Sequence, residues 1–339
     1  MELADRVCQQ LSEEVIGRDP SVEEVQDMVE RVLVEQGHAK TAKAYILYRA
    51  DRTRAREMNS TLMKIYEDLT FMSASDCDIK RENANIDGDT AMGTMLKYGS
   101  EGAKQFNEMY VLDPKHSQAH INGDIHIHDL DFLTLTTTCC QIDLLKLFHG
   151  GFSTGHGYLR EPNDISSYAA LACIAIQSNQ NDQHGGQSVP IFDYAMAEGV
   201  KKTFRRLYTT NLAKAVSFTL GIEDYTEVLE EFKLIAGDIA KEYGLYPSLQ
   251  NNDEYKAKEW EIASAKYGDE FSHLQDRAEK LAESETDRAT YQAMEALIHN
   301  LNTMNSRAGA QNPFSSINYG TDTSPEGRMV TVSYTHLTL

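Results

Sequence analysis

The sequence predicts a mixed α/β protein, and three observations support this fold class. Residues 1–57 carry apolar side chains at helical spacing. The run from 193 to about 300 is again largely helical. Between and after these helices lie two segments with strand character, at 133–141 and 311–320. We therefore expect helices packed with a small number of strands.

Length, composition and charge narrow the possible functions. The chain has 339 residues, enough for one large domain or two smaller ones. Its net charge of −20 opposes binding to DNA or RNA polymers, although a local pocket for one nucleotide stays open. No apolar run reaches membrane-spanning length and the N-terminus lacks a signal-peptide core, so we expect a cytoplasmic protein without membrane contact. The five cysteines lack framework spacing, which favours reduced thiols: Cys8, Cys77, Cys139, Cys140 and Cys173.

The N-terminal helices have clear start and stop signals. Ser21 and Glu24 fit a capping box, in which each side chain accepts a hydrogen bond from the other residue's backbone amide. Gly37 ends this helix, and a second helix starts near Ala39. The tail of the second helix is basic, which we interpret as a solvated helix face: Arg49, Arg52, Arg54 and Arg56.

The chemically richest stretch runs from Ala119 to Gln141. His126 and His128 stand two residues apart, so both can face the same pocket. Cys139 and Cys140 are neighbours in a predicted strand, where successive side chains point to opposite faces. Three interpretations compete: a buried strand with satisfied polar groups, a metal site built from His-x-His and a thiol, or a redox or radical thiol below a polar pocket. The residues alone rank these only loosely.

Several later segments also carry predictions. Four glycines within 150–157 indicate a tight backbone and possible close approach to a ligand. Residues 166–176 predict a buried helix, and residues 177–188 form a polar stretch predicted to be a functional or mobile loop. Residues 223–242 are amphipathic and should end at Gly244, and residues 253–288 are most simply a solvated helical pair.

Several long motifs resemble the anaerobic (class III) ribonucleoside-triphosphate reductases. Gly-Asp-Ile-His-Ile-His-Asp-Leu at 123–130 and Thr-Cys-Cys-Gln at 138–141 carry the resemblance first. It continues, in family order, through 150–161, 178–188 and 313–328. Residues 1–57 resemble the C-terminal part of an ATP-cone, the regulatory nucleotide module in front of many such enzymes.

The resemblance implies a partial ten-stranded α/β barrel of the glycyl-radical enzyme type, preceded by a helical ATP-cone remnant. It implies anaerobic reduction of ribonucleoside triphosphates for DNA synthesis, with formate as reductant. The family pattern Thr-Cys-x-Gln assigns the strand thiol to Cys139, with Cys140 as the alternative. Substrate-positioning roles fall on Asn122, His126 and His128. The allosteric specificity loop falls on Gln177, Asn179, Asn181, Asp182, His184, Gly185 and Gly186.

The same resemblance implies domains at 1–57 for the cone, 58–332 for the barrel part and 333–339 for a non-native tail. Nucleotide effectors (ATP, dATP and other deoxyribonucleotides), a radical-SAM activating enzyme and a homodimer are implied as partners. The finger-loop cysteine, the zinc site and the radical glycine of the family have no counterpart here, so we expect a fragment that is inactive alone and holds no metal. Two other functions stay open, an ATP- or dATP-binding regulatory module and a metal-dependent hydrolase using His126, His128 and Asp129.

Overall fold

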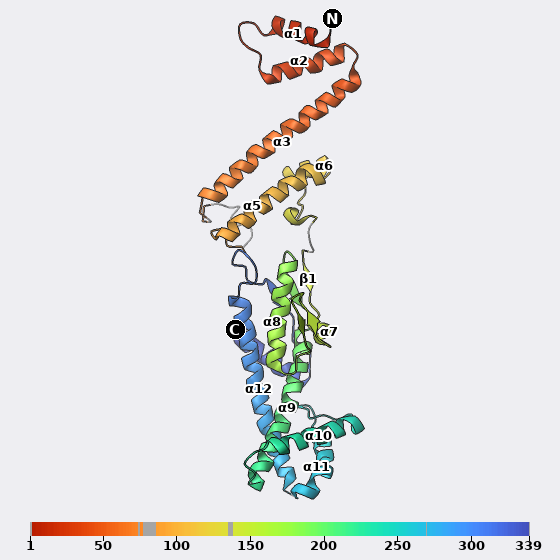
Figure 1. Cartoon of the computed structure of the whole chain (residues 1–339), viewed down its shortest axis with the longest axis vertical. Helices are drawn as coiled ribbons and strands as arrows, with labels where there is room; N and C mark the ends of the chain where they lie inside the picture. The colour runs from red at the N-terminus through yellow and green to blue at the C-terminus, as the bar shows by residue number, and fades with distance from the viewer. Residues whose placement is uncertain (1, 74, 77–85, 135–137, 269, 339) are drawn as a thin grey trace. The chain divides into compact units, whose positions relative to one another are not determined.

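The computed structural model describes residues 2–73, 75–76, 86–134, 138–268 and 270–338 (Figure 1). Cys77 and the central part of the strand predicted at 133–141 lie outside the described residues. The chain forms two compact units, Met1–Glu82 with Thr94–Asp131, and Asn83–Gly93 with Phe132–Leu339. Each unit is described by itself.

The first unit is helical. Its helices are α1 (Leu3–Glu14), α2 (Val22–Glu35), α3 (Ala39–Phe71), most of α5 (Ala91–Phe106), the π-helix η1 (Asn107–Val111) and α6 (Pro114–Ile121). The predicted capping box is confirmed, because the Glu24 amide donates to Ser21 Oγ at 3.2 Å and the Ser21 amide donates to Glu24 Oε2 at 2.8 Å. Gly37 takes a left-handed φ of 79° after α2, as predicted. Helix α3 continues through the position of the domain boundary predicted after residue 57.

The second unit contains a small parallel sheet in the order β1-β4-β5. These strands are β1 (Cys140–Gln141), β4 (Gln187–Val189) and β5 (Ser315–Ile317). A separate antiparallel pair, β2 (Phe152–Ser153) and β3 (Tyr158–Leu159), occupies the glycine-rich segment. Gly150, Gly151, Gly155 and Gly157 all have positive φ there, which confirms the tight backbone predicted for it.

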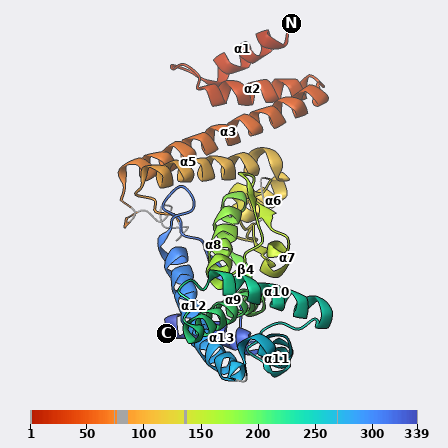
Figure 2. The ribbon, with the colours of Figure 1, turned by 60° about the horizontal axis from the view of Figure 1, so that its bottom comes forward.

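Helices make up the rest of this unit and enclose two apolar cores (Figures 1 and 2). One core lies where α8, α9, α12 and α13 pack together, and the other lies among α9, α10, α11 and α12. The helices are α7 (Leu144–Phe148), α8 (Ile165–Asp182), α9 (Phe192–Leu220), α10 (Thr226–Tyr243), α11 (Asp253–Tyr267), α12 (Phe271–Thr303) and α13 (Pro325–Thr338). The protein is therefore mostly helical with small sheets.

Three sequence-based predictions need correction. The segment from Leu133 was expected to be extended, but η2 (Leu130–Phe132) and a turn precede the undescribed residues, and β1 contains only Cys140–Gln141. The strand expected at 311–320 is limited to Ser315–Ile317. The short strands reflect pairing with neighbours far along the chain, which local propensity does not report.

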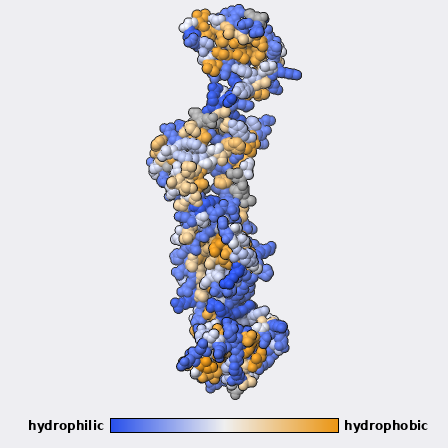
Figure 3. Space-filling model, viewed as in Figure 1, coloured by the Kyte–Doolittle hydropathy of each residue, from blue (hydrophilic) through white to orange (hydrophobic). Residues whose placement is uncertain are grey.

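The third correction concerns residues 253–288, which are not simply a solvated pair. Phe271, Ala278 and Ala282 of α12 are buried in the second core. Polar side chains of the same segment are buried as well, including Thr286 and Glu259. Figure 3 shows that hydrophilic residues still dominate much of the exposed surface of this unit on the face in view. The charged residues therefore cover the outer face of helices whose inner face is packed.

Glu259 is a carboxylic acid enclosed by three hydrogen-bond donors. Tyr208 donates to Oε2 at 2.7 Å, Tyr255 donates to Oε1 at 3.2 Å, and Gln275 Nε2 donates to Oε2 at 2.8 Å. The side chain is 1% exposed. Burial raises the pKa of Glu259 to about 7, against the opposing effect of these donors and of Lys256.

We expect this acid to make the second unit less stable as pH rises. Its folded pKa lies above its unfolded value, so its contribution is complete below the unfolded pKa of 4.5 and is lost as pH rises through about 7. The loss should amount to roughly 3 kcal/mol. Urea unfolding of wild type and Glu259→Gln between pH 5 and 8 measures it. The free energy of unfolding of wild type should fall relative to that of Glu259→Gln as pH rises from 5 to 8. A difference that stays constant with pH would contradict the raised pKa of Glu259.

Candidate functional site

The three-stranded sheet has one face against α8 and one face that borders a cavity. In β4, Gln187 and Val189 are buried while Ser188 between them is only half-buried. The parallel register pairs Cys140 with Gln187 and Ser188 with Ser316. Because paired residues in neighbouring strands share a face, Ser188 and Ser316 lie on the face opposite Gln187.

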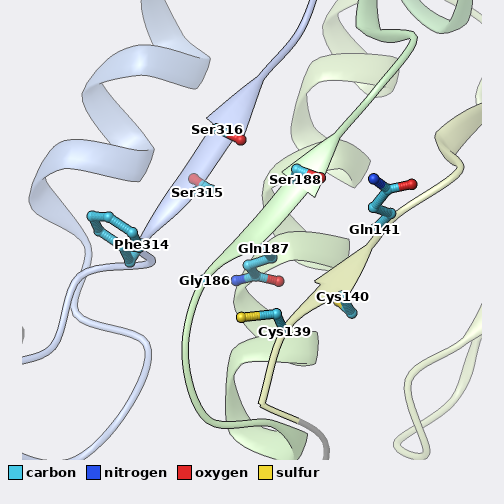
Figure 4. A pocket seen from close by; sticks show the side chains of 9 residues that line it. All are labelled: Cys139, Cys140, Gln141, Gly186, Gln187, Ser188, Phe314, Ser315 and Ser316. Atoms are coloured by element: carbon cyan, nitrogen blue, oxygen red, sulfur yellow. The ribbon is translucent and has the colours of Figure 1, made fainter. Parts of the chain in front are cut away.

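The cavity beside this sheet has a volume of about 440 Å³ (Figure 4). All three strands contribute to it, together with the residues just before them. Its lining therefore combines thiols, hydroxyls, amides and one aromatic ring. The lining residues are Cys139, Cys140, Gln141, Gly186, Gln187, Ser188, Phe314, Ser315 and Ser316.

The two cysteines border the same cavity but differ in their surroundings. Cys139 is exposed, whereas Cys140 is half-buried and its sulfur accepts a hydrogen bond from Asn179 Nδ2 at 2.9 Å. Figure 4 shows the two side chains leaving the backbone in different directions. This agrees with the strand alternation predicted from the sequence. Cys139 alternates with Cys140 and so belongs with Gln141, Ser188 and Ser316 on the face away from α8.

Gly185 lets the chain pass close to the thiol segment. Its φ is 96°, in the left-handed region. A Cβ at this position would stand 2.0 Å from the Thr138 carbonyl oxygen and 3.4 Å from the Cys139 sulfur. Only glycine fits this approach without a shift of the backbone.

The predicted histidines lie in the first unit. The His126 and His128 rings have centroids 5.9 Å apart, and His120 lies 5.7 Å from His126. His120 Nδ1 accepts the Ile127 amide at 3.2 Å. Asn122 is exposed, and its Oδ1 accepts from Gln118 Nε2 at 2.8 Å. Within the described part of the chain, no group of three or more His, Cys, Asp or Glu side chains could hold a metal ion.

The predicted specificity loop requires a correction. Gln177–Asp182 is the last part of helix α8, and only residues 183–186 form a loop before β4. The amide side chains of this segment do not require a loop, because they form hydrogen bonds while the backbone stays helical. Gln177 donates to Asn300 Oδ1 on α12, and Asn181 donates to the Gln177 carbonyl within its own helix. The His184 ring stacks on Phe132, with centroids 3.9 Å apart.

Arg307, which no sequence motif marked, connects the end of α8 to the segment before β5. Its guanidinium donates to the carbonyl oxygens of Gln180 and Gln183 at 2.9 and 2.8 Å, and its Nε donates to Gln311 Oε1 at 2.8 Å. Gln180 Nε2 in turn donates to the Asn312 carbonyl at 3.0 Å. The run of small residues after Arg307 was the only sequence signal of a close backbone approach.

The arginines of α3 are not a simple solvated face. Arg49 is paired with Glu23, Asp27 and Glu30. Arg54 donates to the Glu108 carbonyl at 3.1 Å and to the hydroxyl of buried Ser117 at 3.0 Å. A second cavity of about 360 Å³ lies between α2 and α3, lined by Gln26, Tyr45, Tyr48, Arg49, Arg52, Ala55 and Arg56.

Two family models match different stretches of the chain. Residues 1–54 match the ATP cone domain. Residues 82–339 match the family described as anaerobic ribonucleoside-triphosphate reductase. The chain belongs to this family.

Individual relatives agree with this assignment. The anaerobic ribonucleoside-triphosphate reductase of Escherichia coli (strain K12) is 25% identical over 323 residues, which are 94% of this chain and 37% of that protein. The enzyme of the same name from Enterobacteria phage T4 is 24% identical over 262 residues, 75% of this chain and 32% of that protein. The chain thus spans little more than a third of the length of the curated relatives it matches. None of the helices in the described residues is long and apolar enough to cross a membrane.

Proposed function

We propose that this chain contributes the first barrel strand and the regulatory cone of an anaerobic ribonucleoside-triphosphate reductase. The reaction is the reduction of ribonucleoside triphosphates to deoxyribonucleoside triphosphates for DNA synthesis. Formate supplies two electrons and is oxidised to carbon dioxide, the C2′–O bond breaks, and the oxygen leaves as water. The observation that carries the proposal is the exposed Cys139 thiol, which lies beside a cavity on the sheet face opposite α8.

Cys139 is the residue of this chain that acts on the sugar. Its thiol delivers reducing equivalents while the 2′ hydroxyl departs, because a thiol is a good hydrogen donor to a carbon radical. A glycyl radical and a finger-loop cysteine, which the family carries outside this stretch together with zinc, start the reaction when present. Ser188 and Ser316 border the same cavity and offer hydroxyls to a bound nucleotide.

Other residues have supporting roles in the proposal. Asn122, His126 and His128 position the substrate. The polar segment from Gln177 to Gly186 links the effector site to the substrate, so that the bound effector decides which base is accepted. Residues 307–312 share this regulatory role, because Arg307 and Asn312 are hydrogen-bonded to the segment at Gln180 and Gln183. The β1-β4-β5 sheet is part of a ten-stranded barrel. The enzyme is cytoplasmic, acts as a homodimer and receives its radical from a radical-SAM activating enzyme.

The cone binds ATP or dATP as an effector. The match of residues 1–54 to the ATP cone domain supports this. The cavity between α2 and α3 has suitable chemistry, because the Arg52 guanidinium lies 5.4 Å from the Tyr48 ring centroid and Arg56 stands nearby. Guanidinium groups suit phosphates, and tyrosine rings suit a stacked base.

An anaerobic assay of the intact reductase with labelled formate tests the proposal. We expect deoxyribonucleoside triphosphate and labelled carbon dioxide to form in equal amounts. Product formation without consumption of formate would contradict the proposed reductant, and the absence of product from the activated enzyme would contradict the function.

A further inference from the structure

Asn179 connects helix α8 to two strands of the sheet through a single side-chain amide. Its Nδ2 donates to the Cys140 sulfur at 2.9 Å and to Gln187 Oε1 at 2.7 Å. Gln187 Nε2 in turn donates to the Ile176 carbonyl of α8 at 2.8 Å. Cys140 and Gln187 are register partners in β1 and β4. The amide therefore holds two paired residues on the helix-facing side of the sheet.

Strand β1 is short. It contains two residues, and its backbone bonds to the neighbouring strand include Cys140 N to the Gly186 carbonyl at 3.3 Å and Ile142 N to the Ser188 carbonyl at 2.8 Å. A shift of register by one residue would move every side chain of the strand to the other face. Such a shift would exchange the places of Cys139 and Cys140.

We propose that Asn179 is a positioning residue that fixes the orientation of β1, so that Cys139 rather than Cys140 is presented on the sheet face away from α8, where it is exposed beside the cavity. The inference deepens the proposed function, because it explains how one thiol of a neighbouring pair is selected. In this proposal Asn179 contributes to regulation through its contact with the thiol strand β1, and not by touching an effector itself. The geometry can nevertheless be tested in this chain without any turnover.

The next residue of α8, Gln180, connects this arrangement to the segment at 306–312. Gln180 donates to the Asn312 carbonyl, accepts from the Ser306 hydroxyl, and receives the Arg307 guanidinium at its carbonyl oxygen. One helical turn thus contacts the thiol strand through Asn179 and the segment before β5 through Gln180. A ligand that moves the segment at 306–312 would act on β1 through this turn.

Competitive alkylation of the intact chain with iodoacetamide, followed by peptide mass spectrometry, measures the facing of the two thiols. In the wild type, Cys139 should react faster than Cys140, because it is exposed and Cys140 is held by Asn179. Asn179→Leu removes the donor at similar volume. It should raise the ratio of the Cys140 rate to the Cys139 rate by about fivefold, the factor that corresponds to one hydrogen bond of about 1 kcal/mol.

Asn181→Leu is the matched control, because Asn181 lies on the same helix and its side-chain amide, within the described part of the chain, donates to its own helix at the Gln177 carbonyl. It should leave the ratio unchanged. Asn179→Ala, which removes the N–H donor without adding a charge, should shift the ratio in the same direction, and it replaces the leucine variant if circular dichroism shows that variant to be poorly folded. An unchanged ratio in both Asn179 variants, or an equal rise of both rates, overturns the inference. A failed reductase assay with the predicted alkylation ratios would instead reject the proposed function alone.

Discussion

Cys139→Ser in the intact reductase should abolish deoxyribonucleotide formation while the activating enzyme still generates the radical. A serine O–H bond is much stronger than a thiol S–H bond, so the hydroxyl cannot deliver a hydrogen atom to the sugar. The barrier should rise by roughly 4 kcal/mol or more, which lowers the rate at least about a thousandfold. Product formation by chromatography and radical content by electron paramagnetic resonance are measured on the same sample.

Cys140→Ser is the matched control for this prediction, since it makes the same chemical change one residue along the chain. The Asn179 amide can donate to a serine hydroxyl as it does to the Cys140 sulfur. We expect this variant to keep most of its turnover. Loss of turnover in Cys140→Ser together with full turnover in Cys139→Ser would reverse the assignment of the two thiols.

Asp193→Ala should cost about 3 kcal/mol of the free energy of unfolding, the upper part of the range found when buried hydrogen-bonding groups lose a charged partner. The carboxylate is fully buried at the start of α9. Its Oδ2 accepts from the amides of Gly320, Thr321 and Asp322 at 2.8, 2.9 and 2.8 Å, and its Oδ1 accepts from the Tyr194 amide at 3.1 Å. Alanine would leave this group of donors without a partner.

The pH dependence gives this prediction a second measurement. Burial opposes ionisation of Asp193, but the four backbone donors outweigh it and hold its pKa below the ordinary value. The stabilisation is therefore present above the unfolded pKa and is lost as pH falls through the folded pKa. Urea unfolding at pH 7 and at low pH should show the largest difference between wild type and Asp193→Ala at pH 7. Asp193→Asn, which keeps one acceptor oxygen, should lie between them, and a loss below about 1 kcal/mol in the alanine variant would contradict the role.

The parts of the fold that sequence predicted well depend on local chemistry. The Ser21 capping box, the glycine end of α2 and the end of α10 at Gly244 each need only a few neighbouring residues. Such signals act within one turn of helix, so they can be read along the chain. The tight glycine-rich backbone at 150–157 belongs to the same group.

The parts that sequence misjudged depend on partners far along the chain. Gln177 and Gln180 favoured a loop by composition, but their bonds to Asn300 and Asn312 keep them in α8. Arg54 was predicted to be solvated, but in the folded protein its guanidinium donates to the Ser117 hydroxyl and the Glu108 carbonyl. No local pattern contains these contacts, because tertiary packing decides them.

The candidate site combines both cases. The Thr-Cys-Cys-Gln motif identified the thiol pair, and strand alternation predicted that the two sulfurs would differ. The family pattern assigned the role to Cys139, and the register of β1 with β4 and the contact of Asn179 with Cys140 support this proposal. The pairing of Ser188 with Ser316 likewise became visible only in the sheet.

The most direct test of this account is a structure of the intact reductase with a bound ribonucleoside triphosphate and its effector. We predict that the ribose lies over β1, with the Cys139 sulfur within about 4 Å of the C2′ or C3′ carbon, as van der Waals contact requires. The Cys140 sulfur should remain on the α8 side, next to Asn179. A ribose in contact with Cys140, or bound away from β1, would contradict the central assignment.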